Sequence, residues 1–273
     1  MAEGDPTERA ADDAHVWWRT ELVDSTPEGV WFRGRPIEEL IGTYSVADLL
    51  WLLIVGDDPV PASSRLLEAV LVSGASFGPR APSIAVARMA ATCGVPMNGV
   101  LSSAVGMLGD IHGGAIEQSG EVIATVAGYE DLDAAADEVV GRTRDAGGFV
   151  PGFGHRFLTR DPRAVRLQAL VREHLDDLDD DGRYLEAGSA IEAALARRVG
   201  RTLPMNVDGG SAVALLTIGF PTSAYRGVFC LSRSVGILSE AHEELLQGGR
   251  LKGPSHPRDG SVAYVGPPHR TSP

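Results

Sequence analysis

Hydrophobic residues recur at intervals of three and four through most of the 273-residue chain, the spacing that places them on one face of an α-helix. Ser45 and Asp48 form a capping-box pair that opens a helix over 45–55, and Gly56 follows its end. The same spacing predicts further helices over 61–73, 83–93, 97–108, 113–127, 130–145, 161–176, 184–199, 209–218 and 223–247. Runs rich in glycine and proline separate these segments.

The N-terminal part of the chain has a different pattern. Residues 1–14 are polar and acidic, and we expect them to be disordered. The stretch "WWRTELVDSTPEGVWFRGRP" contains two β-prone pieces on either side of Ser25–Gly29, which predicts a small hairpin. The expected fold class is therefore all-α, with a small β element near the N-terminus.

Charge and composition narrow the possible partners. The net charge of −13 and the isoelectric point near 4.9 argue against nucleic acid and against an anionic membrane surface. An anionic small molecule stays compatible, because a local arginine cluster can act within an acidic protein. The most apolar run, "VADLLWLLIVG", is too short to span a bilayer. Cys93 and Cys230 form no disulfide framework and the N-terminus is the reverse of a signal peptide, so we expect a cytoplasmic protein.

Three glycine-rich loops each place one titratable residue beside a predicted helix terminus. His112 lies in "GDIHGGA", His155 in "VPGFGHRFLTRDPRA" and Asp208 in "PMNVDGGSA". Glycines next to such a residue let a ligand approach the backbone, and the N–H groups of a helix N-terminus favour an oxyanion. We therefore expect the glycines around His155 to admit a large anionic substrate.

Each loop taken alone also has a purely structural interpretation, a hydrogen-bonded histidine or an aspartate that caps a helix. The chain has no zinc-ligand spacing, so no metal site is expected. It also lacks a serine nucleophile elbow, a P-loop and a dinucleotide fingerprint. Together, two histidines and one carboxylate fit the abstraction of a proton next to a carbonyl, where a neutral donor holds the developing enolate oxygen.

At this point the sequence resembles the citrate synthase superfamily. "HGGA", "PGFGHR" with "DPRA", and "NVD" occur in the order of that family's three catalytic segments. "WFRGRPIEEL", "SRSVGILSEAHEE" and the late "YVGP" are similar to other segments of the family, so the resemblance extends from about residue 19 to 267. It implies a citrate-synthase-like helical fold: one domain over 15–273, with a large helical core and a reduced small subdomain around 150–205.

The resemblance also implies roles for the three loop residues. Asp208 would be the base at the methyl group of acetyl-CoA, and His112 would donate a hydrogen bond to the thioester oxygen as it becomes an enolate. His155 would bind the keto oxygen of oxaloacetate. A coenzyme A thioester would then be the substrate, together with a dicarboxylic or tricarboxylic acid, and no tightly bound cofactor is expected.

The family's arginine positions are matched as well. Arg163 of "DPRA" and Arg233 of "SRSVG" fall where the family binds substrate carboxylates, the contact for which a planar guanidinium is suited. Arg156 and Arg258 are further candidates, and Arg258 would come from the tail and from a neighbouring subunit. No residues are assigned to coenzyme A.

Length and one local departure refine the expected activity. The chain is shorter than full citrate synthases and is closer in size and motifs to stand-alone citryl-CoA lyase, which would convert citryl-CoA to acetyl-CoA and oxaloacetate. A short citrate synthase and a catalytically weak regulatory paralogue are the alternatives, and a plain helical interaction domain is a more distant one. Ser76 and Phe77 stand where the family usually has a substrate-binding histidine, which predicts altered specificity for the acid. The apolar region 83–108, rich in small residues, predicts a homodimer.

Overall fold

A computed structural model of the chain describes residues 17–156 and 158–255, and the chain divides into two compact units, one up to Arg65 and one from Leu66. The stretch expected to be disordered, residues 1–14, lies outside the described residues. The first unit begins with a three-stranded antiparallel sheet and continues with two helices. These elements are β1 (Val23–Thr26), β2 (Gly29–Phe32), β3 (Arg35–Pro36), α2 (Ile37–Leu40) and α3 (Val46–Val55).

The predicted hairpin is confirmed, with Thr26 opposite Gly29 at the turn between β1 and β2. The predicted cap of α3 is confirmed too. The Ser45 side chain accepts a hydrogen bond from the Asp48 N–H, and the Asp48 carboxylate accepts one from the Ser45 N–H at 2.9 Å. Gly56 ends the helix in the left-handed region with φ of 109°.

The second unit is helical, and α4 (Pro61–Ser73) leads into it. Its further elements are η1 (Gly78–Arg80), α5 (Pro82–Thr92), α6 (Met97–Gly106), α7 (Ala115–Ala127), α8 (Leu132–Asp145), α9 (Pro162–Glu173), α10 (Leu175–Leu178), α11 (Arg183–Val199), α12 (Val207–Thr217), η2 (Thr222–Ala224) and α13 (Tyr225–Leu246). The expected helices are present with ends within two residues of the predicted ones, except that 161–176 is broken at His174 into α9 and α10. The all-α class with a small N-terminal β element is confirmed.

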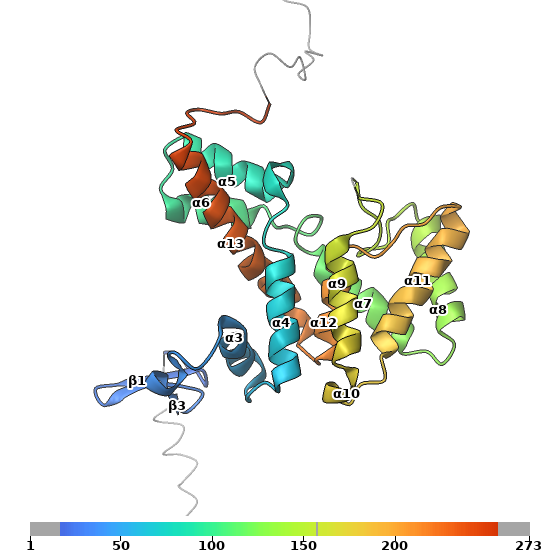
Figure 1. Cartoon of the computed structure of the whole chain (residues 1–273), viewed down its shortest axis with the longest axis horizontal. Coiled ribbons are helices and arrows are strands. Elements are labelled where there is room, and N and C mark those ends of the chain that lie inside the picture. The colour runs from blue at the N-terminus through green and yellow to red at the C-terminus, as the bar shows by residue number, and fades with distance from the viewer. Residues whose placement is uncertain (1–16, 157, 256–273) are drawn as a thin grey trace, which may run out of the picture. The chain divides into compact units, whose positions relative to one another are not determined.

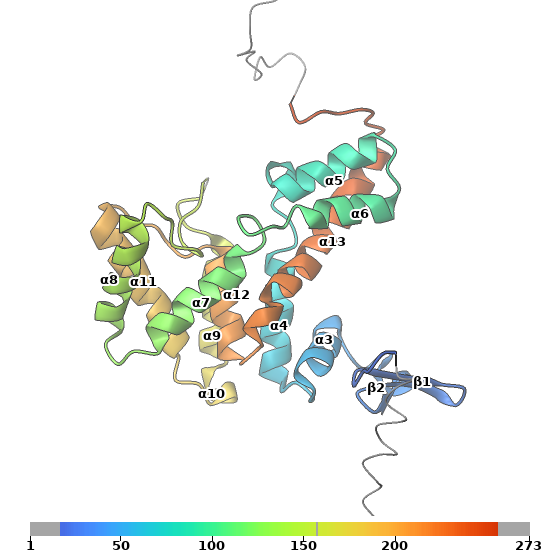
Figure 2. The same ribbon diagram turned by 180° about the vertical axis from the view of Figure 1, so that it is seen from behind.

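Helix α12 forms the centre of the second unit and packs against α7, α9 and α11 (Figures 1 and 2). Its residues from Gly209 to Leu215 are buried, and small side chains let its neighbours come close. A Cβ on Gly210 would lie 2.9 Å from the Ala164 Cα, so α12 and α9 nearly touch along their backbones. This contact brings the start of α9 beside the start of α12.

Helices α5, α6 and α13 pack together in a second group (Figure 2). Alanines and three branched residues make up its buried core: Ala81, Ile84, Ala87, Ala91, Val100, Ala104, Ile237 and Ala241. Within the described part of the chain, no helix combines the length and the apolar character needed to cross a bilayer.

Candidate active site

Six of the seven residues singled out from the sequence line one cavity of about 360 Å³ in the second unit. They are His112, His155, Arg156, Arg163, Asp208 and Arg233. The seventh, Arg258, lies outside the described residues. Residues of the turn that carries η1, both histidine loops and the first turns of α9 and α12 complete the lining. Segments as far apart in the chain as Phe77 and Arg233 therefore meet at one place.

Gly152 is fixed by packing, a role that the sequence analysis did not give it, whereas Gly154 lines the cavity. Gly152 has φ of 83°, and a Cβ there would lie 1.9 Å from the Ser119 Oγ and 3.0 Å from the Gly209 Cα. The Asn206 N–H donates to the Gly152 carbonyl at 2.9 Å. The loop before His155 thus lies directly on α7 and on the start of α12.

Asn206, which the sequence analysis did not single out, caps α12 and joins two of the loops. Its Oδ1 accepts hydrogen bonds from the N–H groups of Asp208 at 2.9 Å and Gly209 at 3.3 Å, and its Nδ2 donates to the Gly154 carbonyl at 2.9 Å. Helix α12 consequently begins at Val207, two residues earlier than predicted, and Asp208 is not its cap. Asparagine is a preferred N-cap residue, so Asn206 could have predicted this helix start from the sequence.

The carboxyl group of Asp208 lies in the first turn of α12 and retains little exposure. Burial raises its pKa to about 6, although the charges of Arg163 and Arg233 pull it down. The nearby Asp161 charge adds to the upward shift. Asp208 is therefore largely ionised at neutral pH and has a proton affinity suited to a general base.

Arg163 is held by its neighbour Asp161. The buried Asp161 carboxylate accepts two hydrogen bonds from the guanidinium, from Nε at 2.9 Å and from Nη2 at 2.8 Å. It also accepts the backbone N–H groups of Arg163 and Val207, each at 3.0 Å. Burial alone would raise the pKa of Asp161, but these hydrogen bonds and the Arg163 charge lower it overall. Asp161 thus caps α9, orients the Arg163 guanidinium and connects α9 to the start of α12 through the Val207 N–H.

A relay of three side chains fixes the proton on His112. The buried Arg233 can only donate, and its Nη1 lies 3.1 Å from the Ser83 Oγ. The Ser83 backbone N–H donates to His112 Nε2 at 3.4 Å, which makes Nε2 an acceptor, so the Ser83 hydroxyl at 3.1 Å from the same nitrogen donates to it as well. Burial and the Arg233 charge both lower the pKa of His112. A neutral His112 with an accepting Nε2 carries its proton on Nδ1.

His155 has the opposite tautomer. Its Nδ1 accepts the Leu158 N–H at 3.0 Å, so the neutral imidazole carries its proton on Nε2. Burial and Arg163 lower the pKa of His155, and Asp161 opposes them. The Phe77 ring lies edge-to-face against the imidazole with centroids 5.1 Å apart, and the Arg163 guanidinium lies 4.9 Å from the Phe77 centroid. The cavity therefore holds two neutral imidazoles beside one carboxylate.

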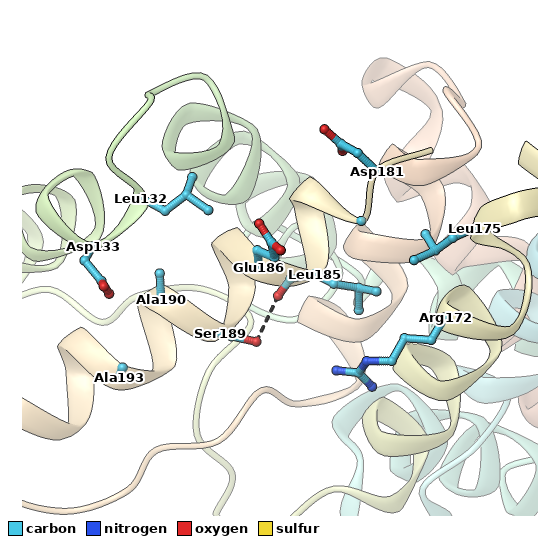
Figure 3. Close-up of a pocket in the computed structure, with 11 residues that line it drawn as sticks. Leu132, Asp133, Arg172, Leu175, Asp181, Leu185, Glu186, Ser189, Ala190 and Ala193 are labelled. Atoms are coloured by element: carbon cyan, nitrogen blue, oxygen red, sulfur yellow. Dashed lines mark hydrogen bonds between the residues drawn. The ribbon is translucent and has the colours of Figure 1, made fainter. Parts of the chain in front are cut away.

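A larger hollow of about 560 Å³ lies along α11, between α8 and the α9–α10 corner (Figure 3). Leucines, acidic residues and small residues line it with one cation, Arg172. The Ser189 hydroxyl is used within α11, where it donates to the Leu185 carbonyl at 2.9 Å. None of the predicted site residues reaches this hollow.

No cluster of three or more histidine, cysteine or acidic side chains within residues 17–156 and 158–255 is arranged to hold a metal ion. The carboxylate, imidazoles and guanidiniums that line the cavity support acid–base chemistry beside a cationic surface. Arg80, on η1, adds a fourth guanidinium to Arg156, Arg163 and Arg233 in the cavity lining, and the sequence analysis missed it.

Comparison with known families agrees with this geometry. Residues 56–255 match the family model described as "Citrate synthase, C-terminal domain". The citrate synthase of Acidithiobacillus ferridurans is 28% identical over 222 residues, which cover 78% of this chain and 55% of that protein. The chain thus spans about half the length of the curated relatives it matches.

Solved structures show the same fold. Citryl-CoA lyase from Hydrogenobacter thermophilus is similar with a TM-score of 0.81 and 27% identity, and the match covers 94% of this chain and 98% of that one. ATP citrate lyase from Methanothrix soehngenii, solved with citrate and coenzyme A, is similar with a TM-score of 0.80 and 20% identity over 98% of this chain and 45% of that one. Because the identity to ATP citrate lyase is 20%, this similarity supports the fold alone.

Proposed function

Because this chain belongs to the citrate synthase family and is an enzyme of that family, we propose that it makes and breaks a carbon–carbon bond between the α-carbon of an acyl-CoA thioester and the keto carbon of a 2-oxo acid. The reaction would be of citryl-CoA lyase type. One observation carries this proposal: the cavity unites a carboxylate of near-neutral pKa with two neutral imidazoles whose protons lie on opposite ring nitrogens.

In the bond-forming direction, Asp208 removes a proton from the α-carbon of the thioester. The electron pair moves toward the thioester oxygen, and the Nδ1–H of His112 donates a hydrogen bond to the oxygen as its negative charge grows. The enolate carbon attacks the keto carbon, and the keto oxygen takes up the Nε2 proton of His155 and becomes the hydroxyl of the product. Solvent then restores the proton of His155 and accepts the one that Asp208 removed, so the protons balance. Cleavage runs the same steps backward, and Asp208 then returns the proton to carbon.

Arginines in the cavity lining supply the positive charge that would bind a carboxylate of the acid. Arg233 is almost fully buried, and Arg163 lines the same cavity with its Nε and Nη2 bonded to Asp161. Arg156 is exposed near His155. A carboxylate between two guanidiniums forms charge-assisted hydrogen bonds, which orient the keto carbon for attack. The acid is thereby placed next to the base.

The structural match to a citryl-CoA lyase supports cleavage over synthesis. The match with the Hydrogenobacter citryl-CoA lyase covers 94% of this chain and 98% of that one, whereas the match with the Acidithiobacillus citrate synthase covers 55% of that protein. We therefore assign citryl-CoA, which would yield acetyl-CoA and oxaloacetate, as the reference substrate. A short citrate synthase that also hydrolyses the thioester is the second candidate, because the curated relatives that match by sequence are citrate synthases.

We also propose a homodimer and a single functional domain over residues 15–273. Within it we propose that the small subdomain is the part between Gly154 and Pro204, a proposal supported by the hydrogen bond that the Gly154 N–H donates to the Pro204 carbonyl at 2.7 Å. Helices α9, α10 and α11 lie between these two residues.

The purified chain should be incubated with citryl-CoA and, separately, with acetyl-CoA and oxaloacetate, while thioester, free thiol and oxo acid are followed. A lyase converts citryl-CoA to acetyl-CoA and oxaloacetate and releases no free thiol. Release of the coenzyme A thiol would identify a synthase instead. If neither mixture changes, and the chain fails to exchange the methyl protons of acetyl-CoA with deuterated water when a 2-oxo acid is present, the proposed function is wrong.

A further inference from the structure

The turn that carries His112 is closed by hydrogen bonds within itself. The Gly109 carbonyl accepts three of them, from the N–H groups of His112 at 3.1 Å, Gly113 at 2.7 Å and Gly114 at 3.0 Å. Ile111, directly before the histidine, is 98% exposed. These bonds give the turn its shape, but they do not attach it to the helices around it.

Arg226, in the first turn of α13, makes that attachment. Its Nη1 pairs with the Asp110 carboxylate at 2.8 Å, and its Nε and Nη2 donate to Glu117 on α7 at 3.2 and 3.0 Å. Asp110 precedes His112 in the turn, and Glu117 follows it in the first turn of α7. One guanidinium therefore bridges the chain on both sides of the histidine. We call Arg226, Asp110 and Glu117 the Arg226 clamp.

The guanidinium of the clamp lies against bare backbone. A Cβ on Gly114 would lie 2.8 Å from the Arg226 Nη2 and 2.9 Å from the Asp110 Cα. The Gln118 Nε2 adds a further bond from α7 to the turn, since it donates to the Asp110 carbonyl at 3.2 Å. The lack of a side chain at Gly114 thus lets Arg226 contact both carboxylates across the start of α7.

A second arginine of α13 holds the ring of His112. Arg233 lies two helical turns after Arg226, on the same face of the helix. Its Nη1 donates to the Ser83 Oγ at 3.1 Å, and Ser83 donates to His112 Nε2 through its hydroxyl and its N–H. Helix α13 therefore fixes the turn through Arg226 and the imidazole through Arg233.

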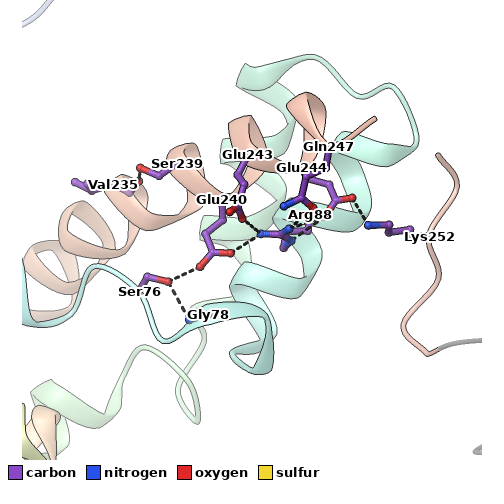
Figure 4. A network of polar contacts seen from close by, with 10 residues as sticks. All are labelled: Ser76, Gly78, Arg88, Val235, Ser239, Glu240, Glu243, Glu244, Gln247 and Lys252. Carbon is purple, nitrogen blue, oxygen red and sulfur yellow. Dashed lines mark hydrogen bonds and ion pairs between the residues drawn. The ribbon is translucent and has the colours of Figure 1, made fainter. Parts of the chain in front are cut away.

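Helix α5, which carries Ser83, is itself joined to α13 by charged groups (Figure 4). Arg88 on α5 donates to Glu240 on α13 at 2.7 Å. The segment Gly74–Ser76 lies along α13 as well, and the Ser76 hydroxyl donates to the other oxygen of Glu240 at 2.9 Å. Helices α5 and α13 thus form one frame, and the place of the histidine against this frame depends on how its turn is attached.

Resting on the proposed function, we infer that Arg226 is a positioning residue of the reaction, which holds the Nδ1–H of His112 opposite the thioester oxygen through Asp110 and Glu117. The hydrogen bond from His112 must be in place while negative charge grows on that oxygen. A displacement of about 1 Å at such a contact costs on the order of 10²-fold in rate. Arg226 is not among the residues that line the cavity, so it acts through the turn and not on the ligands.

The test compares the full chain with Arg226→Ala, using citryl-CoA in one assay and acetyl-CoA with oxaloacetate in the other. We expect kcat to fall by about 10- to 100-fold while the KM values change little, because the lost group touches no ligand. Arg197→Ala is the matched control. Arg197 pairs with Asp137 at 2.9 Å outside the cavity, so its removal should leave kcat at the parent value.

Asp110→Ala tests the clamp from its other end. Asp110 is exposed, so truncating it leaves the core of the protein untouched. The change should lower kcat in the parent and have no further effect once Arg226→Ala is present, because the two residues act as one unit. Nitrogen NMR of the histidine-labelled protein reports the tautomer of His112, which should be Nδ1–H in the parent and a mixture in Arg226→Ala.

Three outcomes would each overturn the inference and leave the proposed function standing. They are a kcat of Arg226→Ala equal to that of Arg197→Ala, losses that add when Asp110→Ala and Arg226→Ala are combined, and a His112 tautomer that Arg226→Ala leaves unchanged. Absence of Asp208-dependent turnover in the parent would instead remove the proposed function, and the tautomer measurement, which needs no turnover, would still decide whether the clamp holds His112.

Discussion

Replacing Asp208 with asparagine should make the protein more stable and the enzyme nearly inactive. The side chain keeps its shape, so the cap of α12 by Asn206 and the packing around Gly209 stay intact. What disappears is a carboxylate that is ionised in a buried place and that would transfer the proton in the reaction. Stability and activity therefore change in opposite directions.

The size of the expected stability change follows from the pKa of Asp208. In the folded protein it is raised from 3.8 to about 6, so the folded state binds the proton more tightly than the unfolded chain does. Stability then falls as pH rises from about 4 to 6 and stays lower above that range, by ~3 kcal/mol at most. Asp208→Asn lacks this penalty, so it should exceed the parent in stability by roughly 2–3 kcal/mol at pH 8 and match it near pH 4.

The magnitude on activity follows from the role of a general base, which usually contributes ~10²–10⁴-fold. Asp208→Asn should lose turnover by about that factor. In the parent, kcat/KM should rise with pH until Asp208 is ionised, at about pH 6, and then level off. Exchange of the acetyl-CoA methyl protons with deuterated water should stop in the variant.

Urea unfolding at pH 8 and at pH 4, with turnover measured on the same samples, provides the assay. Asp161→Asn is the control, and its stability should change in the opposite direction to that of Asp208→Asn. Its carboxylate has a lowered pKa and pairs with Arg163, so removing it should destabilise the protein by roughly 3–5 kcal/mol. A stability gain that is equal at both pH values, or turnover close to that of the parent, would refute the role assigned to Asp208.

Three more outcomes are expected. Arg163→Ala and Arg233→Ala should each weaken binding of the acid by ~2–5 kcal/mol and change coenzyme A binding little in calorimetric titrations, and equal losses for both ligands would contradict the assignment. Gly152→Ala should destabilise the protein in urea unfolding by ~2–3 kcal/mol because its Cβ would overlap a serine hydroxyl, whereas Gly154→Ala, with a similar φ of 78° and no contact closer than 3.5 Å, should cost about 1 kcal/mol. Sedimentation should find a homodimer, and a monomer at every concentration would disprove that proposal.

The sequence predicted the helices and the meeting of three loops because both depend on local patterns. Helical periodicity gave the ends of most helices within two residues, and glycine pairs marked the loops that hold His112 and Asp208. The break at His174 was missed, since 161–176 keeps its apolar spacing while the chain turns into the separate α10. A local pattern cannot reveal such a turn when its cause is how the next helix packs.

The contacts that tune the site could not be predicted, because they join residues far apart in the chain. Ser83 directs a proton to His112 across 29 positions, and Asp161 accepts the Val207 N–H across 46. Neither partner stands out in the sequence, since serine and aspartate have many structural uses. Phe77 could be recognised as unusual, but its place between His155 and Arg163 follows only from the fold of the segment along α13.

The hydrogen bond between Gly154 and Pro204 closes the intervening residues into a large loop, whose two ends lie side by side next to the start of α12. The entropy lost in closing such a loop grows only slowly with its length, by roughly 0.6 kcal/mol for each doubling. Residues can therefore be inserted in the acidic turn Asp179–Gly182, away from these ends, without shifting the two chain segments that meet at Gly154 and Pro204. This turn is the natural place to attach a fluorophore or a fused domain to the working enzyme.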